Sequence, residues 1–196
     1  YPYTIEKDYD KLAEMDADSI KENLKTLEES EEEYFDFSDV GMLDDSITTV
    51  TEKVKPENVI GYIKVPSVNM DMPIMYGTKH QTMLKAGGTM KPNMVMGEGN
   101  YSIAGHNAKN PNILFAPLHR VKIGSEVIIT DLEKEYVYKV DFKEVVMPNR
   151  IDVINEQIDT ETGQPRKMIT LVTCYSADGS DRLIIQGELI EVRDVK

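Results

Sequence analysis

Short apolar runs, separated by Pro, Gly and Asn, recur along the chain after position 60. The clearest pattern spans 135–143, where Tyr136, Tyr138, Val140 and Phe142 alternate with charged residues, as in a β-strand with one buried face. The alternation is lost over 149–167, a length that is typical of a functional or flexible loop. Many short strands with little helix predict an all-β sandwich or barrel. Further strands are predicted over 60–65, 70–74, 100–106, 127–129, 168–173 and 183–185, and short helical turns over 80–85 and 113–118.

The first part of the chain has a helical pattern instead. Ile20, Leu24 and Leu27 follow one another at spacings of four and three, which places them on one side of a helix. Ser19 and Glu22 have the spacing of a capping box, so the helix is predicted to begin near Ile20. So narrow an apolar stripe indicates a helix that docks on a surface or is marginally ordered.

Charge divides the chain into two parts. Residues 1–54 hold 17 acidic residues and 5 lysines, whereas the other 142 residues hold 18 acidic and 17 basic residues. The net charge of −13 therefore lies almost entirely in the first part, and it argues against nucleic acid as a partner. We predict an acidic, mainly helical extension over 1–57 and a β domain over 58–196. A chain that is 40% apolar can form a real core in that domain.

Counts along the chain exclude a membrane-spanning segment and any site built from several cysteines. No apolar run approaches the roughly 18–20 residues that span a bilayer, and no signal peptide begins at Tyr1. The chain has one cysteine, which excludes an intrachain disulfide framework and a cysteine-based zinc site.

That cysteine, Cys174, lies where the predicted strand 168–173 ends, and Arg182 lies where the strand 183–185 begins. The residues between them are rich in Asp, Ser and Gly, which predicts a hairpin with Cys174 and Arg182 facing each other across its open end. A thiol attacks as the thiolate, and a guanidinium nearby stabilises a thiolate or a developing oxyanion. Taken alone, a single cysteine is more often a small buried apolar residue than a nucleophile, and the rest of the motif decides between the two.

Of the three histidines, His106 is the candidate for catalysis. It follows Ala104 and Gly105 at a predicted strand end, and these small residues permit close approach of the backbone. His80 and His119 are surrounded by no such motif and are expected to be surface or packing residues.

These motifs together resemble the sortases, the cysteine transpeptidases of Gram-positive cell surfaces. The resemblance rests on Thr-Leu-Val-Thr-Cys at 170–174, Arg182 eight residues later, and Ser-Ile-Ala-Gly-His at 102–106. It extends from about Ile60 to Val192, and Gly-Asn-Tyr at 99–101 suggests the class A-like branch. The resemblance implies an eight-stranded sortase-type β-barrel.

The resemblance to the sortases also implies how the residues of the site act on a substrate. Cys174 would attack the carbonyl between Thr and Gly of a Leu-Pro-X-Thr-Gly signal and form a thioester, while His106 protonates the departing amine. Arg182 would hold the oxyanion or the carbonyls of the signal. An incoming amine would then resolve the thioester. The expected substrate-binding residues are Ala104, Thr173 and Tyr175 around the nucleophile, and Ile151, Val153 and Ile154 in the 149–167 loop.

No cofactor is expected. Staphylococcal-type sortases bind calcium through acidic residues before the histidine motif, but here Lys91–Glu98 offers only Glu98, and calcium usually needs several carboxylates. The expected partners are surface proteins with the sorting signal and an amine such as a lipid-linked cell-wall precursor. The expected location is the extracellular face of the membrane, through an anchor that this chain lacks.

Two alternatives stay open. One is a pilus-type sortase that joins pilins through a lysine; Asp36-Phe37 only loosely resembles the Asp-Pro-aromatic lid of that group, and the chain ends at Lys196 without a hydrophobic tail. The lid hypothesis, in which the extension covers the site, competes with simple packing of these aromatic residues. The other alternative is a catalytically silent β-barrel adaptor whose acidic extension binds a partner.

Overall fold

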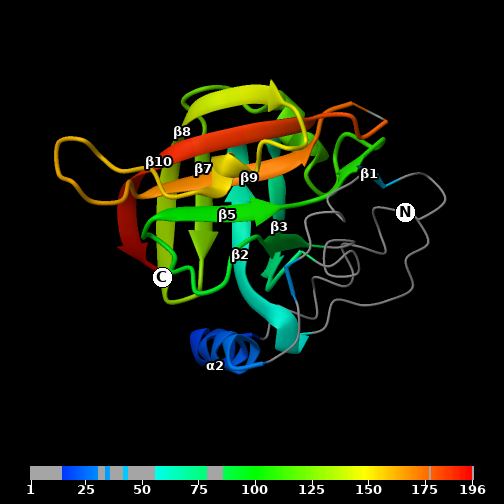
Figure 1. Ribbon diagram of the computed structural model, residues 1–196. Coiled ribbons are helices and arrows are strands. Elements are labelled where there is room, and N and C mark those ends of the chain that lie inside the picture. Colours follow the sequence, from blue (N-terminus) through cyan, green and yellow to red (C-terminus); the bar gives the residue numbers. More distant parts are fainter. Residues whose placement is uncertain are drawn as a thin grey trace.

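A computed structural model describes residues 15–30, 34–35, 42–43, 56–78, 86–176 and 178–195. Within these residues eight strands close into one barrel, so the predicted all-β, eight-stranded fold is confirmed. Figure 1 shows three of its strands, β5, β9 and β10, lying across the near side. Around the barrel the strands follow the order β10 (Arg182–Asp194), β8 (Lys134–Val146), β7 (Glu126–Thr130), β2 (Val59–Val65), β3 (Met70–Met75), β4 (Gly87–Thr89), β5 (Asn100–Ala104) and β9 (Met168–Cys174).

Neighbouring strands are antiparallel except at two places. β3 pairs parallel with β4, and β5 pairs parallel with β9. Because parallel neighbours point the same way, the C-terminal ends of β5 and β9 lie together at one end of the barrel. The pairing of β9 with the antiparallel β10 then brings the start of β10 to the same end.

The core fills the inside of the barrel. Tyr138, Phe115, Ile63, Ile129 and Leu171 have almost no exposed surface. Burying an aliphatic side chain of this size contributes about 1.5–3 kcal/mol, so the barrel is held mainly by these apolar contacts. The strand predicted over 135–143 is confirmed as the middle of β8, which extends further at both ends.

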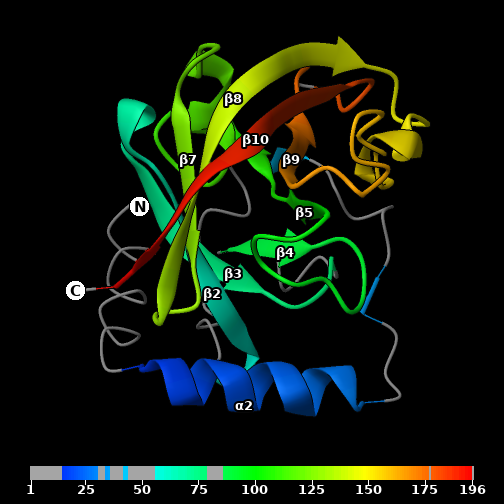
Figure 2. The ribbon, with the colours of Figure 1, turned by 90° about the vertical axis from the view of Figure 1, so that its left-hand side faces the viewer.

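The acidic extension contributes a helix, α2 (Ala17–Glu28), which lies across the lower end of the barrel in Figure 2. Its N-cap is Asp16, so the predicted start near Ile20 is wrong. The Asp16 carboxylate accepts hydrogen bonds from both the N–H and the hydroxyl of Ser19, each at 2.8 Å, and this favours the earlier cap. Ile20 and Leu27 are buried, which confirms the narrow apolar stripe.

A side-chain amide fixes α2 to the barrel. Asn23 Nδ2 donates to the carbonyls of Pro56 and Val59 at 2.8 and 2.9 Å, at the start of β2. The predicted domain boundary falls at the short 3-10 helix η3 (Pro56–Asn58), directly before β2. The predicted lid at Asp36-Phe37 and the predicted turn over 80–85, which includes His80, lie outside the described residues.

The segments around the predicted site are mostly short. The strand predicted over 100–106 ends at Ala104 and is followed by β6 (Asn107–Ala108), which pairs parallel with β1 (Met42–Leu43). The helical turn predicted over 113–118 is a 3-10 helix further along, η5 (Ala116–Arg120). The 149–167 loop contains the 3-10 helix η6 (Ile151–Ile154) and one isolated bridge between Ile158 and Pro165.

Candidate active site

The β9–β10 hairpin places Cys174 directly opposite Arg182. These two residues are register partners at the open end of the ladder, where β9 ends and β10 begins. The predicted hairpin and its facing pair are therefore present in the structure. Ala177, in the loop between the strands, lies outside the described residues.

His106 reaches the same end of the barrel through the parallel pairing of β5 with β9. Ala104 is the register partner of Val172, and His106 and Cys174 each follow two residues later. The Gly105 N–H donates to the Val172 carbonyl at 3.1 Å, which extends the contact beyond the last paired residues. The register thus gathers His106, Cys174 and Arg182 at one end of the barrel.

Close packing explains the glycine before His106. A Cβ on Gly105 would lie 2.5 Å from the ring of Phe115, so no larger residue fits there without displacing that ring. The Phe115 N–H also donates to the His106 carbonyl at 3.0 Å. These contacts hold the main chain of His106, whose side chain is only 2% exposed.

Cys174 is fully buried, and this burial raises the pKa of its thiol. The positive charge of Arg182 opposes the shift, and the negative charge of Asp181 adds to it. Desolvation therefore dominates, and the thiol is protonated at neutral pH.

Arg182 is held by the loop that precedes it. Its Nη1 donates to the carbonyls of Gly179 and Asp181 at 2.9 and 2.8 Å. The Asp181 carboxylate accepts instead from the N–H and hydroxyl of Ser176, both at 2.7 Å, and these bonds lower the pKa of Asp181. The Tyr175 main-chain N–H adds to this lowering.

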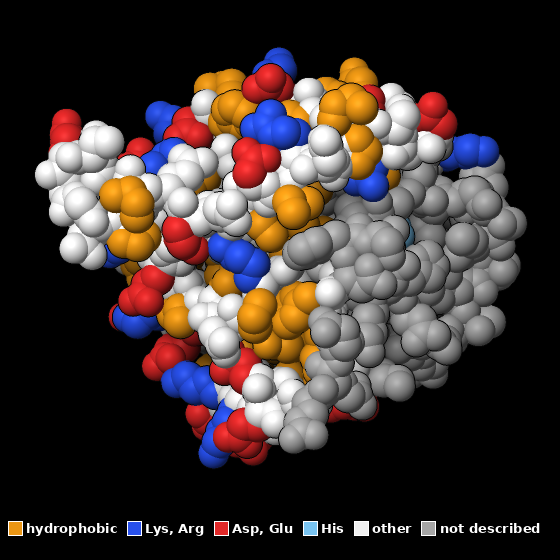
Figure 3. Space-filling view, viewed as in Figure 1, with side chains coloured by type: hydrophobic (Ala, Val, Ile, Leu, Met, Phe, Trp, Pro, Cys, Tyr) orange, Lys and Arg blue, Asp and Glu red, His pale blue; other side chains and the backbone are white. Residues whose placement is uncertain are grey.

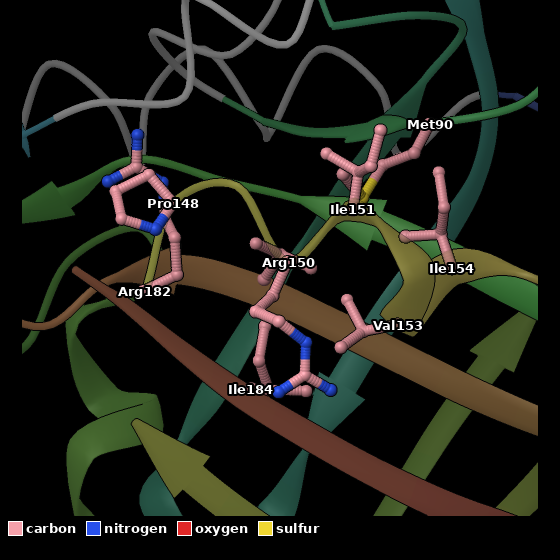
Figure 4. A pocket seen from close by; sticks show the side chains of 9 residues that line it. Met90, Pro148, Arg150, Ile151, Val153, Ile154, Arg182 and Ile184 are labelled. Atoms are coloured by element: carbon pink, nitrogen blue, oxygen red, sulfur yellow. The ribbon is translucent and has the colours of Figure 1, made fainter. Parts of the chain in front are cut away.

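A hollow lies beside Arg182. Ile151, Val153 and Ile154, the loop residues predicted to bind substrate, all line it. Figure 4 shows Ile151 and Ile154 at the end opposite Arg182. Val153 and Ile154 are buried, whereas Ile151 is 59% exposed. The hollow is lined by Met90, Pro148, Arg150, Ile151, Val153, Ile154, Val172, Arg182 and Ile184.

The other two predicted substrate-binding residues of the barrel are buried. Ala104 packs in an apolar cluster with Val153, Ile154 and Val172, beneath the hollow. Thr173 is also buried, and its hydroxyl has no hydrogen-bond partner within the described part of the chain. The face in Figure 3 shows hydrophobic side chains reaching the surface in patches, with charged side chains between them.

A buried polar network fixes η6 against the barrel. The Val153 carbonyl accepts from Asn100 Nδ2 at 2.9 Å and from Gln186 Nε2 at 3.1 Å. Asn100 Nδ2 also donates to the Asn155 carbonyl at 2.9 Å, and Asn100 Oδ1 accepts from the Thr170 hydroxyl at 2.7 Å. Three polar side chains from β5, β9 and β10 thus set the position of one wall of the hollow.

Lys91 binds the end of η6 and a residue just after it. Lys91 Nζ donates to the Ile154 carbonyl and forms an ion pair with Glu156 at 3.1 Å. Glu156 also accepts from the N–H of Asn100 at 2.8 Å. The loop is therefore joined to the barrel by an ammonium group and a carboxylate.

His119 is the residue that sequence reasoning missed. Expected only as a surface or packing residue, it places its Nε2 3.2 Å from the carbonyl oxygen of Cys174. Its ring also stacks on that of Tyr175, with centroids 5.3 Å apart and planes within 7°. Tyr175, one of the predicted site residues, is 49% exposed. No local pattern around position 119 indicates this contact, because the two residues are 55 positions apart.

Among the described residues, no group of three or more His, Cys, Asp or Glu side chains could hold a metal ion. In the same part of the chain, no helix is long and apolar enough to cross a membrane.

Comparison with known proteins identifies the family. A family model described as "Sortase domain" matches residues 63–190. Sortase A of Bacillus anthracis is 32% identical over 170 residues, covering 86% of this chain and 77% of that protein. Sortase A of Listeria monocytogenes is 31% identical over 185 residues, covering 92% and 77%.

Solved structures agree. The crystal structure of Listeria monocytogenes sortase A has a TM-score of 0.65 at 32% identity, covering 71% of this chain and 92% of that one. Streptococcus agalactiae sortase C1 has a TM-score of 0.66 over 94% of this chain and 96% of that one, and at 18% identity it supports the fold alone. The motifs at 102–106 and 170–174, the barrel and these relatives lead to one conclusion: the chain belongs to the sortase family and is a cysteine transpeptidase.

Proposed function

We propose that this sortase is class A-like and cleaves a Leu-Pro-X-Thr-Gly signal between Thr and Gly, then transfers the Thr carbonyl to an amine of a cell-wall precursor. The observation that carries the proposal is the register at one end of the barrel, where Cys174 faces Arg182 and His106 lies at the matching position beyond β5. Similarity to the sortase A proteins supports the class.

Cys174 is the nucleophile in this scheme. The Cys174 thiol gives its proton to His106, the sulfur attacks the Thr carbonyl carbon, the bond to the Gly nitrogen breaks, and His106 passes that proton to the departing nitrogen. The product is a thioester on Cys174. An amine then attacks the same carbon and gives up a proton to His106 as it does so, the carbon–sulfur bond breaks, and that proton returns to the sulfur, which restores the thiol.

Arg182 stabilises the negative charge that develops on the carbonyl oxygen, or holds carbonyls of the bound signal. A guanidinium group acts as a fixed positive charge in proteins, so the role of Arg182 is electrostatic and not proton transfer. Because burial raises the pKa of the Cys174 thiol, the reactive thiolate form is a minority species at neutral pH. The enzyme is therefore slow, and its pH–rate profile is a bell.

The hollow beside Arg182 receives the Leu-Pro end of the signal. Its apolar lining by Ile151, Val153 and Ile154 suits those side chains. Ala104 lies beneath the hollow in the apolar cluster with Val153, Ile154 and Val172, and Thr173 and Tyr175 flank the nucleophile in the chain. In this scheme the protein works at the extracellular face of the membrane on surface proteins that carry the signal.

Activity does not require calcium. Lys91 places a positive charge at the junction between the 149–167 loop and the barrel, where it binds the Ile154 carbonyl and Glu156. A divalent cation at that junction would be repelled by the ammonium group. Equal activity in EDTA and in calcium is the expected result, and a loss in EDTA would contradict it.

The test is incubation with a labelled Leu-Pro-X-Thr-Gly peptide and either a glycine-based or a lysine-based amine. We expect a covalent adduct on Cys174 by intact-mass analysis, followed by transfer to the glycine amine, and no adduct with Cys174→Ala. Transfer only to the lysine amine would favour the pilus-type alternative. If the wild-type protein forms no adduct with peptides varied at X, the proposed function is wrong.

A further inference from the structure

The 3-10 helix η5 connects the main chains of the two proposed catalytic residues. At its start, the Phe115 N–H donates to the His106 carbonyl at 3.0 Å. At its end, the ring of His119 lies 3.2 Å from the Cys174 carbonyl. One short segment thus contacts both the acid and the nucleophile through their carbonyl groups.

The second contact has a defined direction. A carbonyl oxygen can only accept a hydrogen bond, so His119 Nε2 carries the proton between them. Burial lowers the pKa of His119 and is the largest effect; the hydrogen bond to the Cys174 carbonyl opposes it, and the charges of Lys143 and Arg120 lower the pKa further. At neutral pH the imidazole is therefore neutral, with its hydrogen on Nε2.

Both the ring and the main chain of His119 are held by neighbouring residues. Tyr175 stacks against its face almost in parallel. Lys143 Nζ, from β8, donates to the carbonyls of His119 and Val121 at 2.8 Å each, which fixes the main chain beneath the ring. A donor held this firmly can restrain the group that accepts from it.

We infer that His119 is a positioning residue for transpeptidation: by donating its Nε2–H to the Cys174 carbonyl, it holds the Cys174–Tyr175 peptide, and with it the nucleophile, in one orientation at the end of β9. The inference rests on the proposed role of Cys174. His119 does not touch the reacting atoms, and it acts through the main chain that carries them. Loss of the donor lets that peptide rotate, so fewer molecules present the sulfur correctly to the substrate carbonyl.

The experiment separates the donor from the ring. His119→Phe keeps an aromatic ring against Tyr175 but removes the N–H, whereas His119→Gln keeps an N–H donor without the ring. Arg120→Leu is the matched control, because Arg120 lies on the same helix and its Nη1 donates to the carbonyl of Pro111, away from the nucleophile. For each protein, the rate of thioester formation, KM for the signal peptide and Tm are measured.

We expect His119→Phe to slow thioester formation about tenfold with KM within about twofold, as for an interaction that acts only on the chemical step. His119→Gln should stay within about threefold of wild type, and Arg120→Leu should match wild type. His119→Leu replaces the Phe variant if the latter does not fold.

The inference is overturned if the Phe variant matches wild type, if Arg120→Leu slows the reaction equally, or if the Gln variant loses as much as the Phe variant. These outcomes require a wild-type protein that forms the thioester. A wild-type protein that forms none instead refutes the proposed function, and the inference with it.

Discussion

Replacing Asn100 with leucine tests how the barrel shapes the hollow beside the nucleophile. Leucine has the same branching and the same number of side-chain heavy atoms as asparagine, but it has no hydrogen-bonding groups. The change removes the bonds to the Val153 and Asn155 carbonyls and the bond accepted from the Thr170 hydroxyl. The Val153 carbonyl keeps its bond from Gln186, so η6 is loosened rather than released.

The expected loss of stability follows from these three bonds. Each buried hydrogen bond contributes about 1 kcal/mol net, and stranding a buried acceptor costs about 1–3 kcal/mol. A total of about 3 kcal/mol is therefore expected for Asn100→Leu. For a chain of this size, 1 kcal/mol corresponds to about 2–4 °C, so Tm should fall by about 6–12 °C. Thermal unfolding followed by circular dichroism measures this directly.

The same variant should affect binding more than chemistry. Residues 151–154 form one wall of the hollow, so a looser η6 should raise KM for the signal peptide severalfold. The value of kcat should change less, because the substitution touches none of Cys174, His106 and Arg182. Steady-state kinetics well below Tm provide both constants.

Asn23→Leu is the matched control. Asn23 also donates to two main-chain carbonyls, but at the contact between α2 and β2. This variant should lower Tm and leave KM unchanged. A Tm for Asn100→Leu within 2 °C of wild type, or an equal rise in KM for both variants, would refute the reasoning.

Three further predictions concern the Cys174 thiol, the Lys91 side chain and the Tyr138 hydroxyl. Because burial raises the pKa of the Cys174 thiol, its alkylation by iodoacetamide should reach half its maximal rate at a pH above that of an ordinary thiol. Arg182→Gln should move this midpoint higher still, and an unchanged midpoint would contradict the assigned effect of the guanidinium. Lys91→Met should raise KM for the signal peptide severalfold, because it frees the 149–167 loop. EDTA should leave the activity of both the wild-type protein and this variant unchanged. A KM equal to that of wild type would show that the loop is held by other contacts. Tyr138→Phe removes the hydroxyl that accepts from the Gly97 N–H at 3.1 Å and should lower Tm by about 2–6 °C while kcat and KM stay unchanged.

The strands could be predicted where their two faces differ. In β8 the buried Val140 and Tyr138 alternate with exposed charged residues, so the period of two is visible in the sequence. β10 was predicted only over 183–185, although it runs from Arg182 to Asp194. Its last residues are mostly exposed and pair with β8 through two register shifts, so no apolar alternation marks them.

The start of α2 shows a different limit. Asp16 and Ser19 are both good N-cap residues, and a capping box at Ser19 fits the sequence equally well. The choice depends on where the helix meets the barrel, through Ile20, Leu27 and the Asn23 side chain. Tertiary contacts of this kind have no local signature in the sequence.

The residues of the candidate site also differ in how far the sequence predicts their positions. Cys174 and Arg182 are close in sequence, and a hairpin turn between them is enough to predict that they face each other. His106 was found through its motif, but its position depends on a parallel pairing between β5 and β9, which are separated by much of the chain. His119 could not be assigned at all, because its contact with Cys174 depends on the path of η5 after the strand has ended.

The register of β9 is the physical condition on which the site depends. Successive side chains of a strand point to opposite faces, so a shift by one residue would turn the Cys174 side chain away from the face that His106 approaches. The buried partners Ala104 and Val172, and the polar contact between Asn100 and Thr170 at the other end of the same pairing, oppose such a shift. Stability and catalysis therefore depend on the same strand pair: the contacts that close the barrel also determine where the thiol lies.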